Sequence, residues 1–396
     1  MSSGQQSASL GLVCRMARAQ SGWASALLAV VLLLAIHTPV RAQSAPTAPT
    51  QQPIPVLAYY YIWFDPGSWE RAKVDYPLLG RYSSDDKKVM EEHIREAKKA
   101  GIDGFIVSWK STDVLNRRLA QLIEVADAQD FKLAIIYQGL DFDRNPLPVD
   151  RIARDLDYFI ATYAADKAFT MFDQPLVIWS GTWKFKPTDI AKVAGTRRDR
   201  LLILATERNL DGYRHLADFV SGNAYYWSSV DPETFPGYPD KLIGMSEAVH
   251  AHHGLWIAPA APGFDARLIG GSRIVDRKDG VTLRQQMDAA IQSSPDAVGL
   301  ISWNEFSENS YVEPSVNYGS QYLEVLADIR GTVFPKTGDF DSSEPGTTMV
   351  RPGNLILLGA MVLLVLACIL IIAWRNTRRA QIKMFRMSQG DDTSLS

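Results

Sequence analysis

Two glutamates, Glu305 and Glu308, follow directly after an apolar run at residues 297–302. Paired carboxyl groups suit glycoside hydrolysis, because one donates a proton to the leaving oxygen and the other acts as a base or a nucleophile. Like charges held close in a partly apolar cleft push two pKa values apart, so one group stays protonated while the other ionises. The plainer interpretation is a polar loop with two solvated glutamates. Three aromatic side chains could form the apolar wall of such a cleft: Trp303, Phe306 and Tyr311.

The elements that must position these acids are short apolar runs that alternate with amphipathic stretches. Eight runs are predicted strands: residues 56–62, 102–109, 132–137, 175–180, 201–206, 219–225, 255–259 and 297–303. Helical patterns intervene, for example at residues 85–100, 115–129, 149–165 and 283–293. Eight strands alternating with helices predict an α/β fold of the (β/α)8 TIM barrel type. A doubly wound open sheet is the alternative, but it usually carries a Gly-rich nucleotide loop after its first strand, and none is present here.

Polar and aromatic residues stand at the C-terminal ends of these predicted strands, where barrel enzymes build their active sites. Flat aromatic rings can stack on the apolar faces of sugars, and amides and carboxylates can bind their hydroxyl groups. This pattern therefore predicts a carbohydrate substrate. The residues predicted to bind it at this end of the barrel are Tyr60, Trp63, Trp109, Gln138, Glu207, Tyr226, Trp227, Trp303, Asn304 and Tyr311. Glu313, a third acid near the pair, fits a structural or substrate-binding role.

Two hydrophobic segments flank the predicted domain. The first, at residues 26–36, follows a basic start and precedes Val40, Arg41 and Ala42, which resemble a cleavage site, so residues 1–42 predict a signal peptide. An uncleaved anchor is the alternative. The second, at residues 355–374, has twenty residues without a charge, which is enough to cross a bilayer.

Five basic residues follow the second segment, and the positive-inside rule then assigns residues 375–396 to the cytoplasm. The sequence thus predicts a single-pass membrane protein with its large domain on the extracytoplasmic or lumenal side. Polar, Pro-rich stretches at residues 43–54 and 336–354 are predicted linkers, and the barrel domain is predicted between them, at residues 55–335.

Charge and cysteine usage narrow the class of partner. The whole chain has a net charge of −3. With the three basic groups of residues 1–42 and the five basic and two acidic groups of residues 375–396 set aside, the rest carries about −9. Such a domain is a poor partner for nucleic acid, and a neutral substrate fits better. Of the two cysteines, Cys14 lies in the predicted signal peptide and Cys368 in the predicted membrane span, so the domain between them has no disulfide.

A run of three histidines, His250, His252 and His253, raises the question of a metal site. Residues 250 and 253 would share a helix face, but no acid or third ligand is placed to complete the coordination, so a solvated helix end is the favoured interpretation. No metal site is predicted.

The segment around the two acids resembles glycoside hydrolase family 99, the endo-α-mannosidase family, and its relatives. Residues 303–314 read WNEFSENSYVEP, beside a family pattern similar to WNEWHEGTQIEP. Residues 76–82, 97–109 and 261–265 also resemble the family, and the resemblance spans about 270 residues. It differs within the key segment, where Phe306 and Ser307 replace Trp and His, and residues 309–311 replace Gly-Thr-Gln.

The resemblance implies a (β/α)8 barrel and a retaining enzyme that cleaves within α-mannosidic chains. It assigns Glu305 as the base that deprotonates the sugar 2-hydroxyl, giving a 1,2-anhydro sugar, and Glu308 as the acid that protonates the leaving group and later activates water. It also adds Asp265 to the substrate-binding set, and it implies no metal or organic cofactor. Mannan, an α-glucan and a cell-envelope polysaccharide remain open as substrates. A non-catalytic glycan-binding or assembly protein and a polysaccharide-building transferase are the rival functions.

Overall fold

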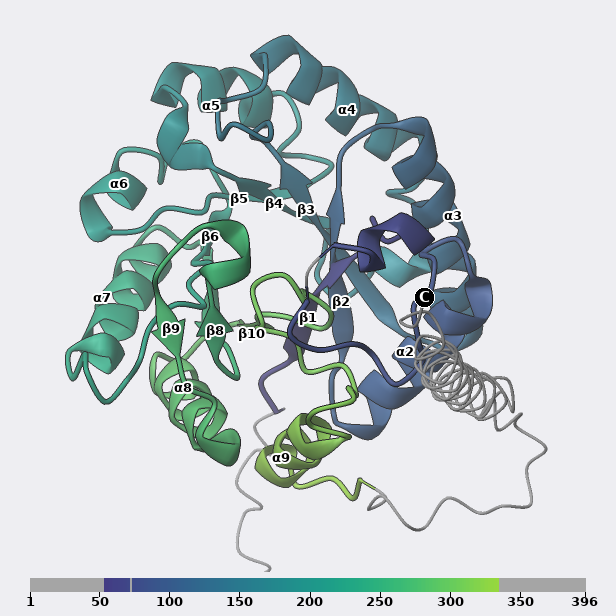
Figure 1. Ribbon diagram of the computed structural model, residues 1–396. Coiled ribbons are helices and arrows are strands. Elements are labelled where there is room, and N and C mark those ends of the chain that lie inside the picture. Colours follow the sequence, from purple (N-terminus) through teal and green to yellow (C-terminus); the bar gives the residue numbers. More distant parts are fainter. Residues whose placement is uncertain (1–52, 72, 335–396) are drawn as a thin grey trace, which may run out of the picture. The chain divides into compact units, whose positions relative to one another are not determined.

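In the computed structural model, residues 53–71 and 73–334 are described, and they form a barrel of parallel strands surrounded by helices (Figure 1). The sheet has eight strands in the order β5-β4-β3-β2-β1-β10-β7-β6, and every neighbouring pair is parallel. Its strands are β1 (Val56–Tyr61), β2 (Gly104–Trp109), β3 (Lys132–Gln138), β4 (Leu176–Ser180), β5 (Leu202–Leu204), β6 (Gly222–Ala224), β7 (Leu255–Ala260) and β10 (Ala297–Leu300).

The two edges of this sheet, β5 and β6, meet through Ala205. Its N–H donates to the carbonyl of Gly222 at 3.0 Å, and its carbonyl accepts from the N–H of Ala224 at 2.8 Å. A single bridge therefore closes the sheet into a nearly complete barrel. This arrangement confirms the predicted barrel and excludes an open doubly wound sheet, whose edge strands would not bond to each other.

The helices cover the outside of the barrel (Figure 1). The α-helices are α2 (Lys87–Lys99), α3 (Asp113–Ala128), α4 (Val149–Thr162), α5 (Pro187–Gly195), α6 (Leu210–Arg214), α7 (Tyr238–Ala251), α8 (Val281–Gln292) and α9 (Gln321–Arg330). Short 3-10 turns are η1 (Pro66–Trp69), η2 (Lys167–Phe169), η3 (Thr182–Lys184), η4 (Arg267–Ile269) and η5 (Lys278–Gly280). In α2 the Asp86 side chain caps the N-terminus by accepting from the N–H of Lys88, and Met90, Ile94 and Ala97 face the core.

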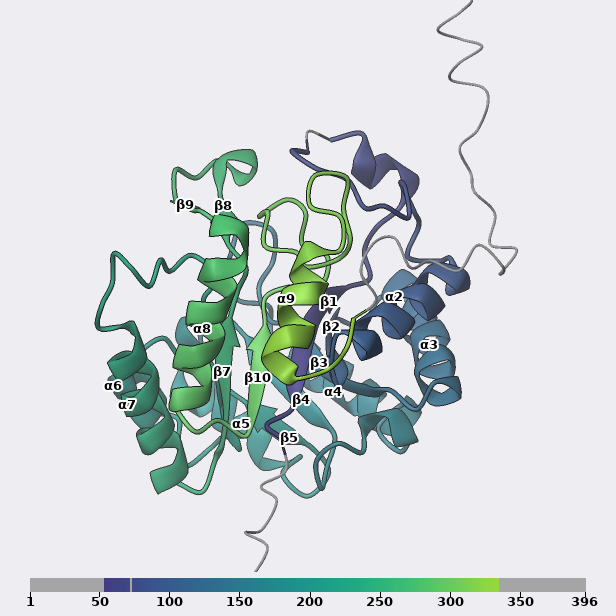
Figure 2. The ribbon, with the colours of Figure 1, turned by 90° about the horizontal axis from the view of Figure 1, so that it is seen from below.

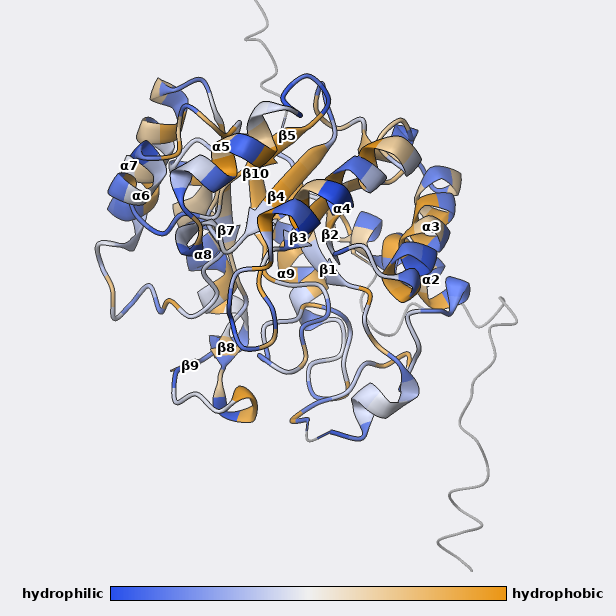
Figure 3. Cartoon of the chain, turned by 90° about the horizontal axis from the view of Figure 1, so that it is seen from above, coloured by the Kyte–Doolittle hydropathy of each residue, from blue (hydrophilic) through white to orange (hydrophobic). Residues whose placement is uncertain are grey.

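Alternation along the strands divides the core into two layers. In β1, Leu57, Tyr59 and Tyr61 pack in the barrel interior, whereas Ala58 and Tyr60 pack in the layer between strands and helices. Figure 3 shows β4 as strongly hydrophobic and the helices as carrying both hydrophobic and hydrophilic residues. A residue's position within its strand therefore decides whether its side chain can reach the interior.

Three segments gather beyond the C-terminal ends of the strands (Figure 2). One is residues 62–86, between β1 and α2. The second is the hairpin of β8 (Phe264–Asp265) and β9 (Ile274–Val275), which follows β7. The third is residues 301–320, between β10 and α9. These segments carry most of the predicted site.

The outer parts of the predicted architecture are not described. No helix within residues 53–71 and 73–334 combines the length and apolar character needed to cross a bilayer. The predicted signal peptide at residues 1–42, most of the first linker, the linker at residues 336–354, the membrane span at residues 355–374 and the tail all lie outside the described residues.

Candidate active site

The loop after β10 fixes the carboxyl group of Glu305. The side chain is only 7% exposed. The N–H of Glu305 donates to Ser302 Oγ at 2.8 Å, and the N–H of Ser307 donates to Glu305 Oε1 at 3.0 Å. The carboxylate is thus oriented by the loop that carries it.

The β8–β9 hairpin holds the second glutamate. The carbonyl of Glu308 accepts from the N–H of Asp265 at 2.8 Å. The next residue, Asn309, turns the chain with a φ of 50°, a left-handed conformation that asparagine tolerates. Arg277 Nη2 donates to the Asn309 carbonyl at 3.0 Å. Residues from two segments therefore fix the backbone on both sides of the Glu308 side chain.

The two carboxyl groups influence each other's protonation. Burial, followed by the charge of Glu308, raises the pKa of Glu305 to about 8, against opposing contributions from Ser307 and Lys73. Burial also raises the pKa of Glu308, with the charge of Arg144 opposing it. Protons leave such a pair in steps that belong to both groups. Both shifts favour retention of a proton on the pair to a higher pH than two solvated glutamates would allow.

Tyrosines line the barrel interior beside the glutamates. The hydroxyl groups of Tyr61 and Tyr226 are 2.8 Å apart. Burial, together with the charges of Glu305 and Glu308, raises the pKa of both phenols, so they stay protonated and can donate hydrogen bonds. Tyr226 was predicted as a site residue and Tyr61 was not, although the alternation of β1 could have indicated it.

An exposed aromatic ring lies next to these tyrosines. Trp63, which is 41% exposed, stacks on Tyr61 with ring centroids 4.3 Å apart. On the neighbouring strands, Gln138 Nε2 donates to Ser108 Oγ at 2.9 Å. The structure thus brings Trp63, Gln138 and Tyr226 to the same end of the barrel as the two acids, with Ser108 as a further polar group that the sequence did not indicate.

Three predicted aromatic site residues face away from the interior. Tyr60, Trp109 and Trp303 are buried in the layer between strands and helices. Tyr60 bonds through its hydroxyl to His93 Nδ1 at 2.9 Å, and Trp109 Nε1 donates to Asn116 Oδ1 at 3.0 Å. Their positions do not support the prediction that they bind a sugar in the barrel. The cause is strand alternation, which turns these side chains outward.

Asn304 and Glu313 are engaged with protein groups. Asn304 Oδ1 accepts from the N–H of Tyr61 at 2.8 Å, and its amide nitrogen donates to the Tyr61 carbonyl at 3.0 Å. Glu313, 2% exposed, accepts from the Tyr82 hydroxyl at 2.9 Å and lies 3.0 Å from His93 Nε2. Their contacts are structural: they join the loop after β10 to β1 and α2.

The other predicted residues lie around the site rather than in it. Tyr311 is fully buried, stacks on Phe306 at 4.0 Å and donates to Asp75 Oδ2 at 2.5 Å. Trp227 packs against Tyr225 and Tyr238 in the outer layer.

Glu207 and Asp265 are both 5% exposed. Burial raises the pKa of Glu207, one of whose oxygens has no hydrogen-bond partner. Asp265 pairs with Arg267 at 2.6 Å, and this hydrogen-bonded pairing lowers the pKa of Asp265.

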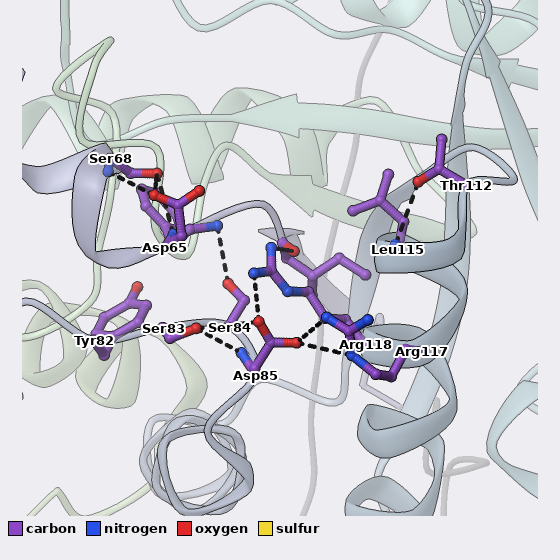
Figure 4. Close-up of polar contacts among 12 residues, drawn as sticks. Asp65, Ser68, Tyr82, Ser83, Ser84, Asp85, Thr112, Leu115, Arg117 and Arg118 are labelled. Carbon is purple, nitrogen blue, oxygen red and sulfur yellow. Dashed lines mark hydrogen bonds and ion pairs between the residues drawn. The ribbon is translucent and has the colours of Figure 1, made fainter.

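The segment that carries Trp63 is anchored to α3 through Asp85 (Figure 4). Asp85 accepts from Arg117 at 2.8 Å and from Arg118 at 2.7 Å, and Arg118 also donates to the Ile62 carbonyl at 3.0 Å. The guanidinium groups, Arg118 first, hold the pKa of Asp85 well below its usual range. Ser84 Oγ accepts from the N–H of Phe64 at 3.1 Å. These contacts fix the start and the end of the segment.

No group of three or more His, Cys, Asp or Glu side chains that could hold a metal ion occurs within residues 53–71 and 73–334. Of the three histidines singled out in the sequence, His250 lies at the end of α7 with its Nε2 atom 3.0 Å from Asp296. This contact resembles an ordinary surface ion pair.

Comparison with known proteins identifies relatives of this barrel. The model of the family described as glycosyl hydrolase family 99 matches residues 70–330. A glycoprotein endo-alpha-1,2-mannosidase-like protein of Danio rerio is 22% identical over 269 residues, covering 61% of this chain and 59% of the relative. A glycoprotein endo-alpha-1,2-mannosidase of Rattus norvegicus is 21% identical over 269 residues, covering 61% and 56%. The chain thus spans less than two thirds of the length of these curated relatives.

Solved structures share the fold. The family 99 endo-alpha-mannosidase from Bacteroides thetaiotaomicron, in complex with bis-tris-propane, superposes with a TM-score of 0.62 at 22% identity, covering 70% of this chain and 96% of that one. A structure described as a glycoside hydrolase-like protein gives a TM-score of 0.57 at 17% identity, covering 72% and 96%. At this level of identity the likeness supports the barrel and not a substrate.

Proposed function

Because the chain belongs to glycosyl hydrolase family 99, we propose that it is a glycosidase that cleaves within α-linked, mannose-containing glycans. The observation that carries the proposal is the pairing of the buried Glu305 with the partly buried Glu308, beside Tyr61 and Tyr226 at the C-terminal end of the barrel. A lectin has no use for two carboxyl groups that share a proton. The endo-mannosidase names of the curated relatives support the choice of linkage.

In the proposed reaction Glu305 removes the proton from the sugar 2-hydroxyl, and the oxygen attacks the anomeric carbon of the same ring. The bond to the leaving oxygen breaks as Glu308 donates its proton to that oxygen, which leaves a 1,2-anhydro sugar. Glu308, now ionised, then takes a proton from a water molecule that attacks the anomeric carbon. Glu305 returns its proton to the 2-oxygen, and two inversions retain the configuration.

Other residues of the site have roles in binding. Trp63 presents an exposed ring beside Tyr61, which suits stacking on a pyranose face. Gln138 and Ser108 offer an amide and a hydroxyl group for sugar hydroxyls. Tyr61 and Tyr226, protonated because their pKa values are raised, can donate hydrogen bonds to sugar oxygens.

We also propose that the enzyme is tethered to a membrane. The support comes from the sequence: the signal-like residues 1–42, the uncharged run at residues 355–374 and the basic residues that follow it. The barrel then faces the extracytoplasmic or lumenal side, where glycans are available.

The test is substitution of each acid by its amide. Glu305→Gln and Glu308→Gln keep the shape of the side chain and remove its proton chemistry, so each should lower the release of reducing ends from α-mannan by about 10²–10⁴-fold. An activated leaving group needs little protonation and should partly rescue Glu308→Gln, but not Glu305→Gln. Glu124→Gln on the exposed face of α3 is the matched control.

A substrate that lacks the 2-hydroxyl separates the mechanisms. It should be inert if this hydroxyl is the nucleophile, whereas a carboxylate nucleophile could still attack it. Full activity in either amide variant would remove that residue from the mechanism and favour a glycan-binding protein that keeps the barrel. Cleavage of α-glucan in place of α-mannan would retain the reaction and change the substrate.

A further inference from the structure

A lysine from the segment after β1 reaches the loop that carries the catalytic pair. Lys73 Nζ donates to Ser307 Oγ at 3.2 Å, and the N–H of Ser307 donates to Glu305 Oε1 at 3.0 Å. Lys73 is half-buried and its charge acts on Glu305. Two hydrogen bonds thus link the lysine to the serine and the serine to the carboxylate. The serine occupies the position of histidine in the family pattern.

The second glutamate has a weaker partner. The cation that acts on Glu308 is Arg144, which is exposed on the loop after β3. Solvent screens an exposed charge more than a half-buried one, which limits the effect of Arg144 on Glu308. The Glu308 side chain also has no counterpart of the N–H that Ser307 gives to Glu305 among the hydrogen bonds of the described residues.

We propose that Lys73, acting through Ser307, raises the fraction of molecules in which Glu305 is ionised and Glu308 carries the shared proton. This inference rests on the proposed function. A pair with one proton has two arrangements, and only the one with Glu305 ionised and Glu308 protonated can react. In the other arrangement Glu305 carries the proton and cannot accept one from the 2-hydroxyl. Lys73 is a positioning residue in this scheme and does not contact the reacting atoms.

The remaining groups around the pair do not replace Lys73. Tyr61 and Tyr226 are neutral and their hydroxyl groups bond to each other. Arg71 acts on Lys73 and lowers its pKa, after burial, which makes the larger contribution. Lys73 is therefore the cation that faces Glu305 from the segment after β1.

The kinetic test is the pH profile of Lys73→Met, measured on the full chain in a mild detergent. We expect kcat to fall about tenfold at the optimum of the unsubstituted enzyme with KM changed less than twofold, and the alkaline limb to move up by about one pH unit, since one unit corresponds to a tenfold change in the balance of the two charge states. Lys73→Arg should restore the profile, and Ser307→Ala should shift it in the same direction as Lys73→Met.

Lys192→Met is the control, because Lys192 is an exposed lysine on α5 that also forms an ion pair, with Asp150. If the pH profile of Lys73→Met has both limbs at the same pH as the unsubstituted enzyme and KM rises, the inference is overturned, because Lys73 would then be a substrate contact.

Thermal unfolding tests the charge relation without any substrate. The loss of melting temperature caused by Lys73→Met should grow between pH 6 and pH 9, as Glu305 ionises, and should be independent of pH in a Glu305→Gln background. Equal losses at all pH values in both backgrounds would contradict the inference. A pH-dependent loss that disappears with Glu305→Gln supports it even if no glycan is hydrolysed, which separates its failure from that of the proposed function.

Discussion

At the residue scale, the environment of Glu305 favours the protonated acid. The side chain is 7% exposed, and burial and the charge of Glu308 raise its pKa from 4.5 to about 8. A buried charge that is incompletely compensated is costly, and active sites commonly accept this cost because the perturbed group is the one that reacts. Glu305 should therefore reduce the stability of the fold at alkaline pH.

The first prediction concerns this cost. Between pH 4.5 and 8 the folded chain binds more protons at Glu305 than the unfolded chain does, so stability falls as the pH rises through that window. Glu305→Gln removes the titration, and its melting temperature should exceed that of the unsubstituted protein at pH 8 by about 2–4 °C for each kcal/mol recovered. The difference should shrink at pH 5. Thermal unfolding followed by circular dichroism measures both.

Glu124→Gln, on the exposed face of α3, should show no such trend. A melting temperature of Glu305→Gln that stays below that of the unsubstituted protein at every pH would show that the carboxylate contributes more to folding than its desolvation costs.

The sequence predicts the acids better than their neighbours. Glu305 and Glu308 can be found because an apolar strand leads straight to them, and a barrel strand must deliver its next residues to the active end. Tyr60 and Tyr61 cannot be separated by residue type. Only the alternation within β1 sends Tyr61 inward and Tyr60 toward His93, and that register depends on pairing with β10 and β2.

At the scale of elements, a buried arginine just after the β8–β9 hairpin contacts the loop after β10. Arg277, 5% exposed, lies 4.5 Å from the ring centroids of Tyr311 and Tyr322 and 4.6 Å from that of Tyr318. It also donates to the Asn309 carbonyl. Desolvated cation–π contacts are worth about 2 kcal/mol or more. Arg277 thus connects the hairpin, the loop that carries Glu308 and α9.

The second prediction follows from this contact. Arg277→Met keeps an unbranched apolar side chain but removes the cation and the hydrogen bond, so the loop should lose order around Glu308. We expect kcat to fall about tenfold and the free energy of unfolding to fall by about 1–3 kcal/mol. Arg273→Met, an exposed residue of the same hairpin, is the control. Unchanged kcat with reduced stability would limit Arg277 to a role in folding.

Strands of two or three residues cannot be predicted from sequence patterns. β8 and β9 have two residues each, and β5 and β6 have three, so no alternation can develop. The predicted runs at residues 201–206 and 219–225 overestimate β5 and β6, because the apolar residues Leu201 and Val220 pack in the helix-facing layer without extending the strands. The longer strands β1, β2, β3, β4 and β7 agree closely with the prediction.

At the scale of the whole molecule, the barrel is held together by its own core. It contains no cysteine, and its two core layers are closed by strand pairing all around the sheet. The parallel barrel was predictable because most of its apolar runs are long enough to be identified and because parallel strands require long crossover connections, usually helices. The flanking segments, by contrast, are predicted from composition alone.

The last prediction concerns how the flanking segments place the barrel. The uncharged run at residues 355–374 is long enough to span a bilayer, and the five basic groups that follow favour retention of the tail on the cytoplasmic side. Protease added outside intact cells, or outside sealed vesicles of matching orientation, should release a soluble fragment of about residues 43–350, while an antibody epitope at the C-terminus stays with the membrane. A chain that ends at residue 354 should be found in the soluble fraction without protease, because it keeps the export signal and lacks the span.

Replacement of the basic groups at 375, 378 and 379 by glutamine should weaken the orientation and leave the barrel sequence untouched. Protection of the barrel together with loss of the C-terminal epitope would reverse the topology and place the site on the side of the membrane where secreted glycans are absent.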